Sequence, residues 1–171
     1  MDRVSKDALL KVLEAFDELA PRAMVLVAVG GTAMTLLGLK ASTKDIDFNI
    51  PSHEDYAEFT RLYNRIKPGV TIDRWERNMV FSEVLPDDYI KRASHYDSGF
   101  HKLVIKVLDP IDIVCSKISR FEEPDMEDIR ECIGKCGLTK SAIKKRALGY
   151  ERAGSDEMFN KNLEYVIGNM F

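Results

Sequence analysis

The segment Val29–Ile50, VGGTAMTLLGLKASTKDIDFNI, places two adjacent glycines after one apolar run and two aspartates at the start of the next. The preceding run, AMVLVAV over residues 23–29, is rich in β-branched side chains and is typical of a strand buried on both faces. Residues 32–39 have the length of a two-turn helix, and KDIDFNI over 44–50 returns to the alternation of a strand. The segment therefore predicts strand, glycine turn, short helix and strand in succession.

The two aspartates, Asp45 and Asp47, are two residues apart. On a strand this spacing puts both carboxylates on one face, about 6–7 Å apart, while Ile46 points to the other face. Two like charges repel each other there unless a cation is supplied, and paired hard oxygen ligands suit Mg²⁺, which also binds substrate phosphates. The alternative is a solvated edge strand that carries both acids as ordinary surface charges.

The two glycines, Gly30 and Gly31, let the backbone approach a ligand closely, so that the first N–H groups of the following helix face it. Thr32 adds a hydroxyl at the same place. A Walker loop and the dinucleotide fingerprint GxGxxG are both excluded by spacing, because no glycine follows Gly31 before Gly38. The glycines predict either a phosphate cradle beside the two aspartates or a plain tight turn.

The rest of the chain predicts an α+β protein, because helical and strand periodicities alternate before a helical last third. We expect one domain over residues 1–171, with a core at about 23–136 and C-terminal helices at about 137–171. The other expected helices are 5–19, 52–66, a short one after Pro86, one from 109 to a break at 121–124, 125–135, 139–152 and 155–170. The other expected strands are 70–75, 79–84 and 101–108, with a loop at 96–99.

Composition limits the class of protein. At 171 residues with 45% hydrophobic content, the chain is globular rather than disordered or fibrous. The net charge of −3 excludes an overall basic field, so a polyanion would be held only by local patches. The cysteines, Cys115, Cys132 and Cys136, lie in helix-like sequence and indicate reduced thiols. No signal peptide or bilayer span is predicted, since the apolar stretch 23–39 is too short. We therefore expect a cytoplasmic protein with no membrane partner.

The segment Val29–Ile50 resembles the first motif of the nucleotidyltransferase superfamily with the polymerase-β-like fold, in which a strand, a Gly-Gly or Gly-Ser turn, a short helix and a DxD strand form the active site. A second block, VLDPIDIVCSKISRFEEPDMEDI over residues 107–129, resembles the downstream pattern of strand, acidic helix start, lysine and Pro-Asp-x-x-Asp. The minimal branch with the abortive-infection (AbiEii) and mycobacterial (MenT) toxins is the most similar. Lys40 corresponds to its basic residue, more usually arginine, and the resemblance covers roughly residues 25–133.

The resemblance implies a nucleotidyltransferase fold, with a small mixed β-sheet flanked by helices and a helical C-terminal extension. It implies Mg²⁺-dependent transfer of a nucleoside monophosphate from a nucleoside triphosphate to RNA, such as a tRNA end, or to protein. A toxin with an antitoxin protein as its partner is one form of this function. The alternative is a catalytically silent member that serves as a nucleotide-binding or protein-interaction module.

The resemblance also implies site residues. Two Mg²⁺ ions would be held by Asp45, Asp47 and a third carboxylate, for which Asp73 in VTIDRW is the candidate and Glu83 the alternative. The phosphates would lie at Gly30, Gly31 and Thr32. The positive charge would come from Lys117, with Lys44 or Lys40, and the paired acids of the second block are Asp125 and Asp128.

Each of these residues has an ordinary structural alternative. Lys117 in mid-helix is compatible with a surface position, and Asp125 and Asp128 with a first helical turn, which the helix dipole favours. Trp75 and Phe100 fit a core or a rim equally. A basic segment at 139–152 fits either an RNA-binding face or a solvated helix face; its residues are Lys140, Lys144, Lys145, Arg146, Tyr150 and Arg152.

Overall fold

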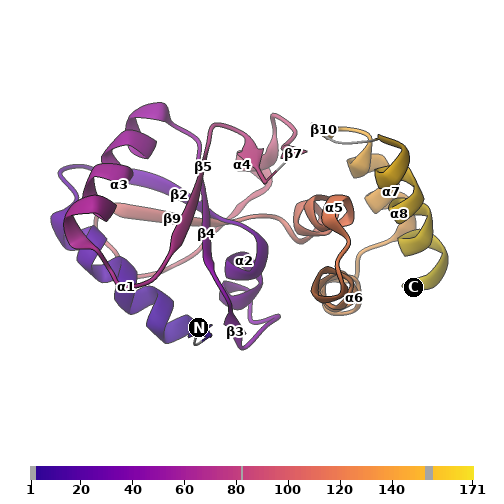
Figure 1. Cartoon of the computed structure of the whole chain (residues 1–171), viewed down its shortest axis with the longest axis horizontal. Coiled ribbons are helices and arrows are strands. Elements are labelled where there is room, and N and C mark those ends of the chain that lie inside the picture. Colours follow the sequence, from indigo (N-terminus) through magenta and orange to yellow (C-terminus); the bar gives the residue numbers. More distant parts are fainter. Residues whose placement is uncertain (1–2, 82, 153–155) are drawn as a thin grey trace.

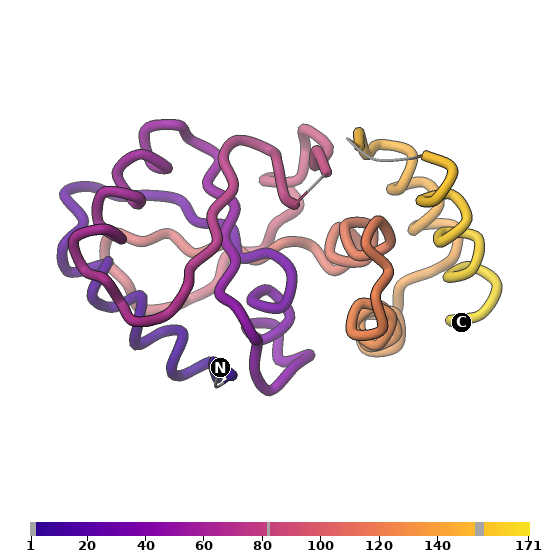
Figure 2. Tube along the Cα trace, in the orientation of Figure 1, coloured from indigo at the N-terminus to yellow at the C-terminus, as the bar shows by residue number. Residues whose placement is uncertain are grey.

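The computed structural model describes residues 3–81, 83–152 and 156–171. A five-stranded sheet with the order β5-β4-β2-β9-β8 lies at its centre. The strands are β2 (Met24–Ala28), β4 (Ile46–Ile50), β5 (Ile72–Glu76), β8 (Ser94–His95) and β9 (Leu103–Val107). Strand β2 runs parallel to β9 and antiparallel to β4, and β4 runs parallel to β5, so the sheet is mixed. Figure 2 shows β9, from the second half of the chain, running beside strands of the first half.

Helices cover both faces of the sheet. Helices α1 (Lys6–Leu19) and α3 (His53–Ile66) pack together on one side, where the rings of Phe16 and Phe59 stack with centroids 4.6 Å apart. The short helix α2 (Gly30–Leu36) lies against β4 on the other side (Figure 1). Because helices enclose the sheet on both faces, every residue of β4 is buried, including Asp47 and Asn49.

Four helices extend the α2 side of the sheet (Figure 1). They are α5 (Pro110–Arg120), α6 (Glu123–Cys136), α7 (Lys140–Ala147) and α8 (Asp156–Asn169). Helix α5 packs on α2 and is surrounded by α6, α7 and α8. It begins as its sequence predicts, with Asp109 accepting a hydrogen bond from the Ile111 amide at 2.9 Å and proline at the first helical position.

A buried ion pair fastens α7 to α5. The Asp112 side chain is fully buried and accepts two bonds from the Arg146 guanidinium, at 2.5 and 2.9 Å. The Tyr150 hydroxyl donates to the same carboxylate at 2.8 Å. Arg146 and Tyr150 are therefore part of the interior, and Arg152 pairs with Asp156, so these three residues do not form the suggested RNA-binding face.

Shorter elements complete the fold. Strands β1 (Val4–Ser5) and β3 (Ser42–Thr43) pair with each other. A separate three-stranded sheet has the order β10-β7-β6, from β10 (Glu151–Arg152), β7 (Glu83–Val84) and β6 (Met79–Val80). Helix α4 (Tyr89–Arg92) follows Pro86 as predicted. Among the described residues, no helix combines the length and the apolar character that crossing a membrane requires.

The α+β class is confirmed, with a mixed sheet between helices and a helical C-terminal part. Some element boundaries were wrong. The strand expected at 79–84 is two short strands, β6 and β7, and Ser82 between them lies outside the described residues. The helix expected at 139–152 ends at Ala147 because Gly149 interrupts it. Helix α2 starts at Gly30 rather than at Thr32. The predicted start of the last helix, Ser155, lies outside the described residues.

Candidate active site

The three predicted carboxylates lie at neighbouring points of the sheet. Asp47 is the second residue of β4, Asp73 is the second residue of β5, and the two are paired in the parallel register. Paired residues of adjacent strands point to the same face, so both side chains share the face that carries α2. Asp45 lies one residue before β4 and is half-buried, Asp73 is exposed, and Asp47 is only 7% exposed.

Burial and the neighbouring carboxylates raise the pKa of Asp47. Burial, followed by the Asp73 and Asp45 carboxylates, raises the pKa of Asp47 to about 7, while Arg120 and Lys117 act in the opposite direction. The three acids therefore belong to one electrostatic site with an excess of negative charge, which a cation would relieve. Within the described ranges, no three His, Cys, Asp or Glu side chains converge as a formed metal cage would require. The donor chemistry fits Mg²⁺, which keeps several waters and needs few protein ligands.

The glycine turn brings the backbone of α2 against Asp47. Gly30 has a φ of +52°, and a Cβ at this position would lie 3.4 Å from Asp47 Oδ2 and 3.7 Å from Phe81 Cζ. Glycine therefore suits both the backbone conformation and the close approach of the carboxylate. The backbone of Gly30 faces the same space as the Asp47 carboxylate.

Thr32 holds the start of β4 in place. Its side chain is fully buried, and its hydroxyl accepts a hydrogen bond from the Asp47 amide at 2.8 Å and donates to the Asp45 carbonyl at 3.3 Å. The Thr43 hydroxyl donates to the same carbonyl at 2.8 Å. The predicted phosphate-binding hydroxyl of Thr32 is thus engaged inside the protein, where it fixes the backbone between the two aspartates.

Gly31→Ala is expected to lower the free energy of unfolding by about 1–3 kcal/mol, because overpacking forces neighbouring groups to move. A Cβ at Gly31 would lie 2.5 Å from Thr43 Oγ1, which would have to leave the Asp45 carbonyl. Urea unfolding measures the loss, and adding Thr43→Ala should recover part of it. The control is Gly134→Ala in α6, where a Cβ meets nothing within 4 Å. Equal stability of the two glycine variants would contradict this packing.

The second block forms a buried charge network next to these acids. Lys117 on α5 is only 4% exposed, and its Nζ lies 2.9 Å from Asp125 Oδ1 and 2.7 Å from Asp128 Oδ2, both on α6. Lys40 approaches the other oxygen of Asp128 at 2.6 Å. The interpretation of Lys117 as a surface residue is therefore wrong.

Asp125 does occupy the first turn of α6, where it forms a capping box with Glu122, whereas Asp128 lies beyond that turn. Although burial acts to raise it, the positive charges of Lys117 and Arg120 hold the pKa of Asp125 below its usual value. The structure therefore brings Lys117, Asp125 and Asp128 together and gives Asp125 a capping role as well.

The remaining predicted residues are separated by the structure. Lys44 is exposed, two residues after β3 begins. Glu83 is buried in β7, opposite Arg152 of β10. Burial raises the pKa of Glu83, and the charges that modify this shift are those of Arg152 and Asp156, whereas Asp73 acts directly on Asp47. Of the two candidates for the third carboxylate, Asp73 is the one beside Asp47.

Two further residues reach the site that sequence reasoning did not select. Arg120, the last residue of α5, donates to Asp125 Oδ1 at 2.8 Å, and its guanidinium carbon lies 4.2 Å from the ring centroid of Phe81. The Phe81 ring in turn lies against Gly30 and packs on Trp75 with centroids 4.5 Å apart.

The spacing of Lys117 and Arg120, i and i+3, would have indicated one helix face. Trp75 follows Asp73 by two residues and so shares its face of β5. Phe81 carried no such signal, because it lies in a turn with a φ of +54°.

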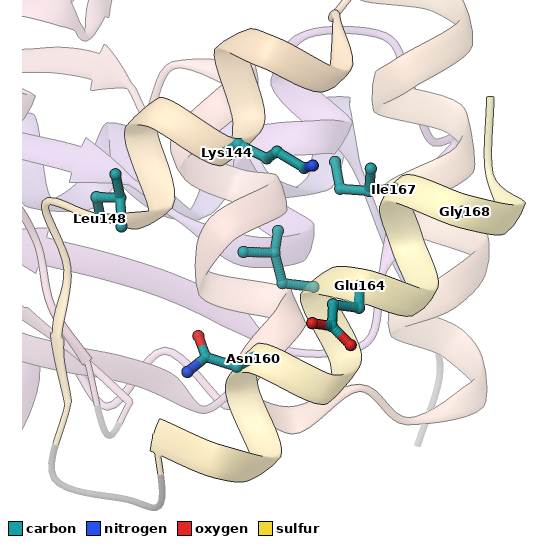
Figure 3. A pocket seen from close by; sticks show the side chains of 7 residues that line it. Lys144, Leu148, Asn160, Glu164, Ile167 and Gly168 are labelled. Carbon is teal, nitrogen blue, oxygen red and sulfur yellow. The ribbon is translucent and has the colours of Figure 1, made fainter.

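A groove of about 590 Å³ lies between α7 and α8, away from the three aspartates (Figure 3). None of the predicted site residues lines it. It is lined by Lys144, Leu148, Asn160, Leu163, Glu164, Ile167 and Gly168.

Comparison with known proteins identifies the fold and the family. The fold is similar to that of an antigenic nucleotidyltransferase-like protein from Paracoccidioides brasiliensis in a crystal structure, with a TM-score of 0.54 and 16% sequence identity over 98% of this chain and 90% of that chain. No curated protein matches the sequence. The chain thus has the nucleotidyltransferase fold. A family described as nucleotidyltransferase of unknown function (DUF6036) matches residues 7–148, which include every predicted site residue, and the chain belongs to this family.

Proposed function

We propose that the protein is a Mg²⁺-dependent enzyme that transfers a nucleoside monophosphate from a nucleoside triphosphate to an acceptor hydroxyl. The observation that carries this proposal is the buried carboxylate of Asp47, in register with Asp73 and preceded by Asp45, with the backbone of Gly30 against it. Clustered like charges destabilise a site that has only a structural role, whereas an enzyme can use clustered carboxylates to hold the metal that binds a polyanion.

Asp45, Asp47 and Asp73 would hold the metal, as two ions in the superfamily arrangement. Bound Mg²⁺ would neutralise the triphosphate and lower the pKa of the attacking hydroxyl. In the reaction, the acceptor oxygen forms a bond to the α-phosphorus, the bond from that phosphorus to the bridging oxygen breaks, and pyrophosphate leaves with the bonding electrons. The hydroxyl proton passes to solvent.

The chain's other residues position these groups. Gly30 lets the backbone lie close to the phosphates beside Asp47, Gly31 makes room for the Thr43 hydroxyl that holds the Asp45 carbonyl, and Thr32 fixes the peptide between Asp45 and Asp47. Lys40, two residues before β3, and Lys44, directly after it, add positive charge for the phosphates.

The acceptor is proposed to be RNA, such as a tRNA end, or protein, in a cytoplasmic enzyme of the AbiEii/MenT toxin type with an antitoxin protein as partner. The resemblance of residues 29–50 to that branch supports this, and the second block, residues 107–129, strengthens the match. The exposed lysines of α7, Lys140, Lys144 and Lys145, are the part of the basic segment that faces solvent, where RNA phosphates would bind.

A catalytically silent nucleotide-binding or protein-interaction module is the second candidate. It is favoured by the lack of a converged group of three possible metal ligands in residues 3–81, 83–152 and 156–171. In a nucleotide-binding module the acids would bind the nucleotide through a single Mg²⁺. In a protein-interaction module they would bind no nucleotide.

The test incubates the purified chain with each of the four α-labelled nucleoside triphosphates, Mg²⁺, and either total RNA or total protein. We expect one nucleotide to be transferred to one class of acceptor, and chelation by EDTA to stop the transfer, because the carboxylates alone repel the triphosphate. Transfer that continues in EDTA would contradict the metal requirement. Mg²⁺-dependent nucleotide binding without transfer to either acceptor would favour the silent module.

A further inference from the structure

We infer that Arg120, rather than Lys117, is the cation of α5 that contacts the triphosphate, and that Lys117 serves to position Arg120. This inference rests on the proposed function, because it names the group that recognises the substrate at the same site. The resemblance to the superfamily assigned this charge to Lys117. The surroundings of the two cations on α5 assign it to Arg120.

Lys117 is poorly placed to meet a ligand. Its side chain is 5% exposed, and its ammonium group lies between Asp125 and Asp128 at 2.9 and 2.7 Å. An ammonium has three donors, and both of these partners are buried carboxylates that need its charge. Drawing Lys117 toward a phosphate would leave two buried acids without it.

Arg120 is accessible in the same neighbourhood. Its side chain is 40% exposed. The bond to Asp125 is made through Nη2. A guanidinium carries five donors in a planar fork that matches phosphate oxygens, so one bond to Asp125 leaves the group able to bind a polyanion as well.

The guanidinium group of Arg120 also contacts an aromatic ring. The guanidinium carbon stacks 4.2 Å above the centre of the Phe81 ring, and the tip of that ring lies against Gly30, where Asp47 Oδ2 also lies. A chain of contacts therefore links Arg120 to Phe81, Phe81 to Gly30, and Gly30 to Asp47. A phosphate chain bound to a metal at Asp47 and lying along Gly30 would meet Arg120.

The segment that leads to Phe81 is held to β4. Asn49 is fully buried and donates from Nδ2 to the carbonyls of Arg77 and Met79, both at 2.8 Å, and the Tyr89 hydroxyl donates to Asn49 Oδ1 at 2.6 Å. The strand that carries Asp47 thus also holds the backbone two residues before Phe81, whose ring Arg120 contacts.

The experiment measures binding of each nucleoside triphosphate and of its monophosphate to the full chain with Mg²⁺, by calorimetry. The variants are Arg120→Gln, Arg120→Lys and the control Arg130→Gln, an exposed arginine of α6. We expect Arg120→Gln to weaken triphosphate binding by about tenfold or more, since a bond between charged groups is lost. Monophosphate binding should change by less than about threefold, and Arg120→Lys should fall between wild type and Arg120→Gln.

The outcomes are separable. Equal loss of triphosphate and monophosphate affinity in Arg120→Gln, or no loss of either, would overturn the inference while leaving the proposed function intact. Wild-type protein that binds no triphosphate would overturn the proposed function, and the inference with it. Thermal unfolding of each variant shows whether the fold is retained, and Arg120→Lys supplies the same comparison if Arg120→Gln is unstable.

Discussion

Asp47→Asn is expected to abolish nucleotidyl transfer while making the folded protein more stable. The carboxylate is proposed to hold the metal, and a neutral amide binds Mg²⁺ poorly. The loss of transfer should be on the order of a thousandfold, as for removal of other preorganised charge-stabilising groups. The labelled-transfer assay measures it. The exposed Asp87 supplies the control variant, Asp87→Asn, which should keep wild-type activity.

The gain in stability follows from the titration of Asp47. Its pKa is about 7 in the folded chain and 3.8 in the reference state, so between these values the folded state holds a proton that the unfolded state has released. The contribution of Asp47 to stability without Mg²⁺ therefore falls as the pH rises from about 4 to about 7, and the loss remains above that pH. A shift of this size corresponds to a cost on the order of 2–4 kcal/mol at pH 8.

Urea unfolding without Mg²⁺, from pH 4 to pH 8, checks the sign. The difference between wild type and Asp47→Asn should be small at pH 4 and should grow in favour of the variant up to pH 7. A variant less stable than wild type at pH 8 would show that the carboxylate is not held in a repulsive site. The joint result of lower activity and higher stability also distinguishes a metal-site residue from a residue needed for folding.

The sequence was sufficient to predict the part of the site that local patterns encode. The double glycine interrupts an apolar run, and the i, i+2 spacing of Asp45 and Asp47 requires only strand geometry. Asp73 was predicted from its place on the strand after a crossover helix, and the parallel register with Asp47 agrees with this. These features depend on residues close together in the chain or on one regular connection.

Features that depend on distant contacts were not predicted. Arg120 and Phe81 are 39 positions apart in the sequence but are in contact, and Asn49 of β4 holds the backbone at Arg77 and Met79 that leads to Phe81. The burial of Lys117 depends on α6 folding back, so that Asp125 and Asp128 reach it. No periodicity within one element contains this information, because each partner comes from a different element.

Lys117→Met should lower the free energy of unfolding by about 3 kcal/mol, at the lower end of the range for breaking a buried ion pair. The lower end applies because Lys40 still pairs with Asp128, and Arg120 with Asp125. Lys135→Met is the control, since Lys135 pairs with Glu131 on the exposed face of α6, where such a pair contributes at most about 1 kcal/mol. Urea unfolding at pH 7 compares the two. Equal losses would mean that the Lys117 network does not support the fold.

Adding Asp128→Asn to Lys117→Met separates support of the fold from binding of substrate. The double variant removes one of the two carboxylates that Lys117 compensates, so it should be more stable than Lys117→Met alone. If Lys117 only positions Arg120, the double variant should regain much of its triphosphate affinity together with its stability, because Arg120 is still present. If Lys117 itself contacts the phosphates, stability should return without affinity. The pair of measurements therefore decides which of the two cations on α5 the substrate meets.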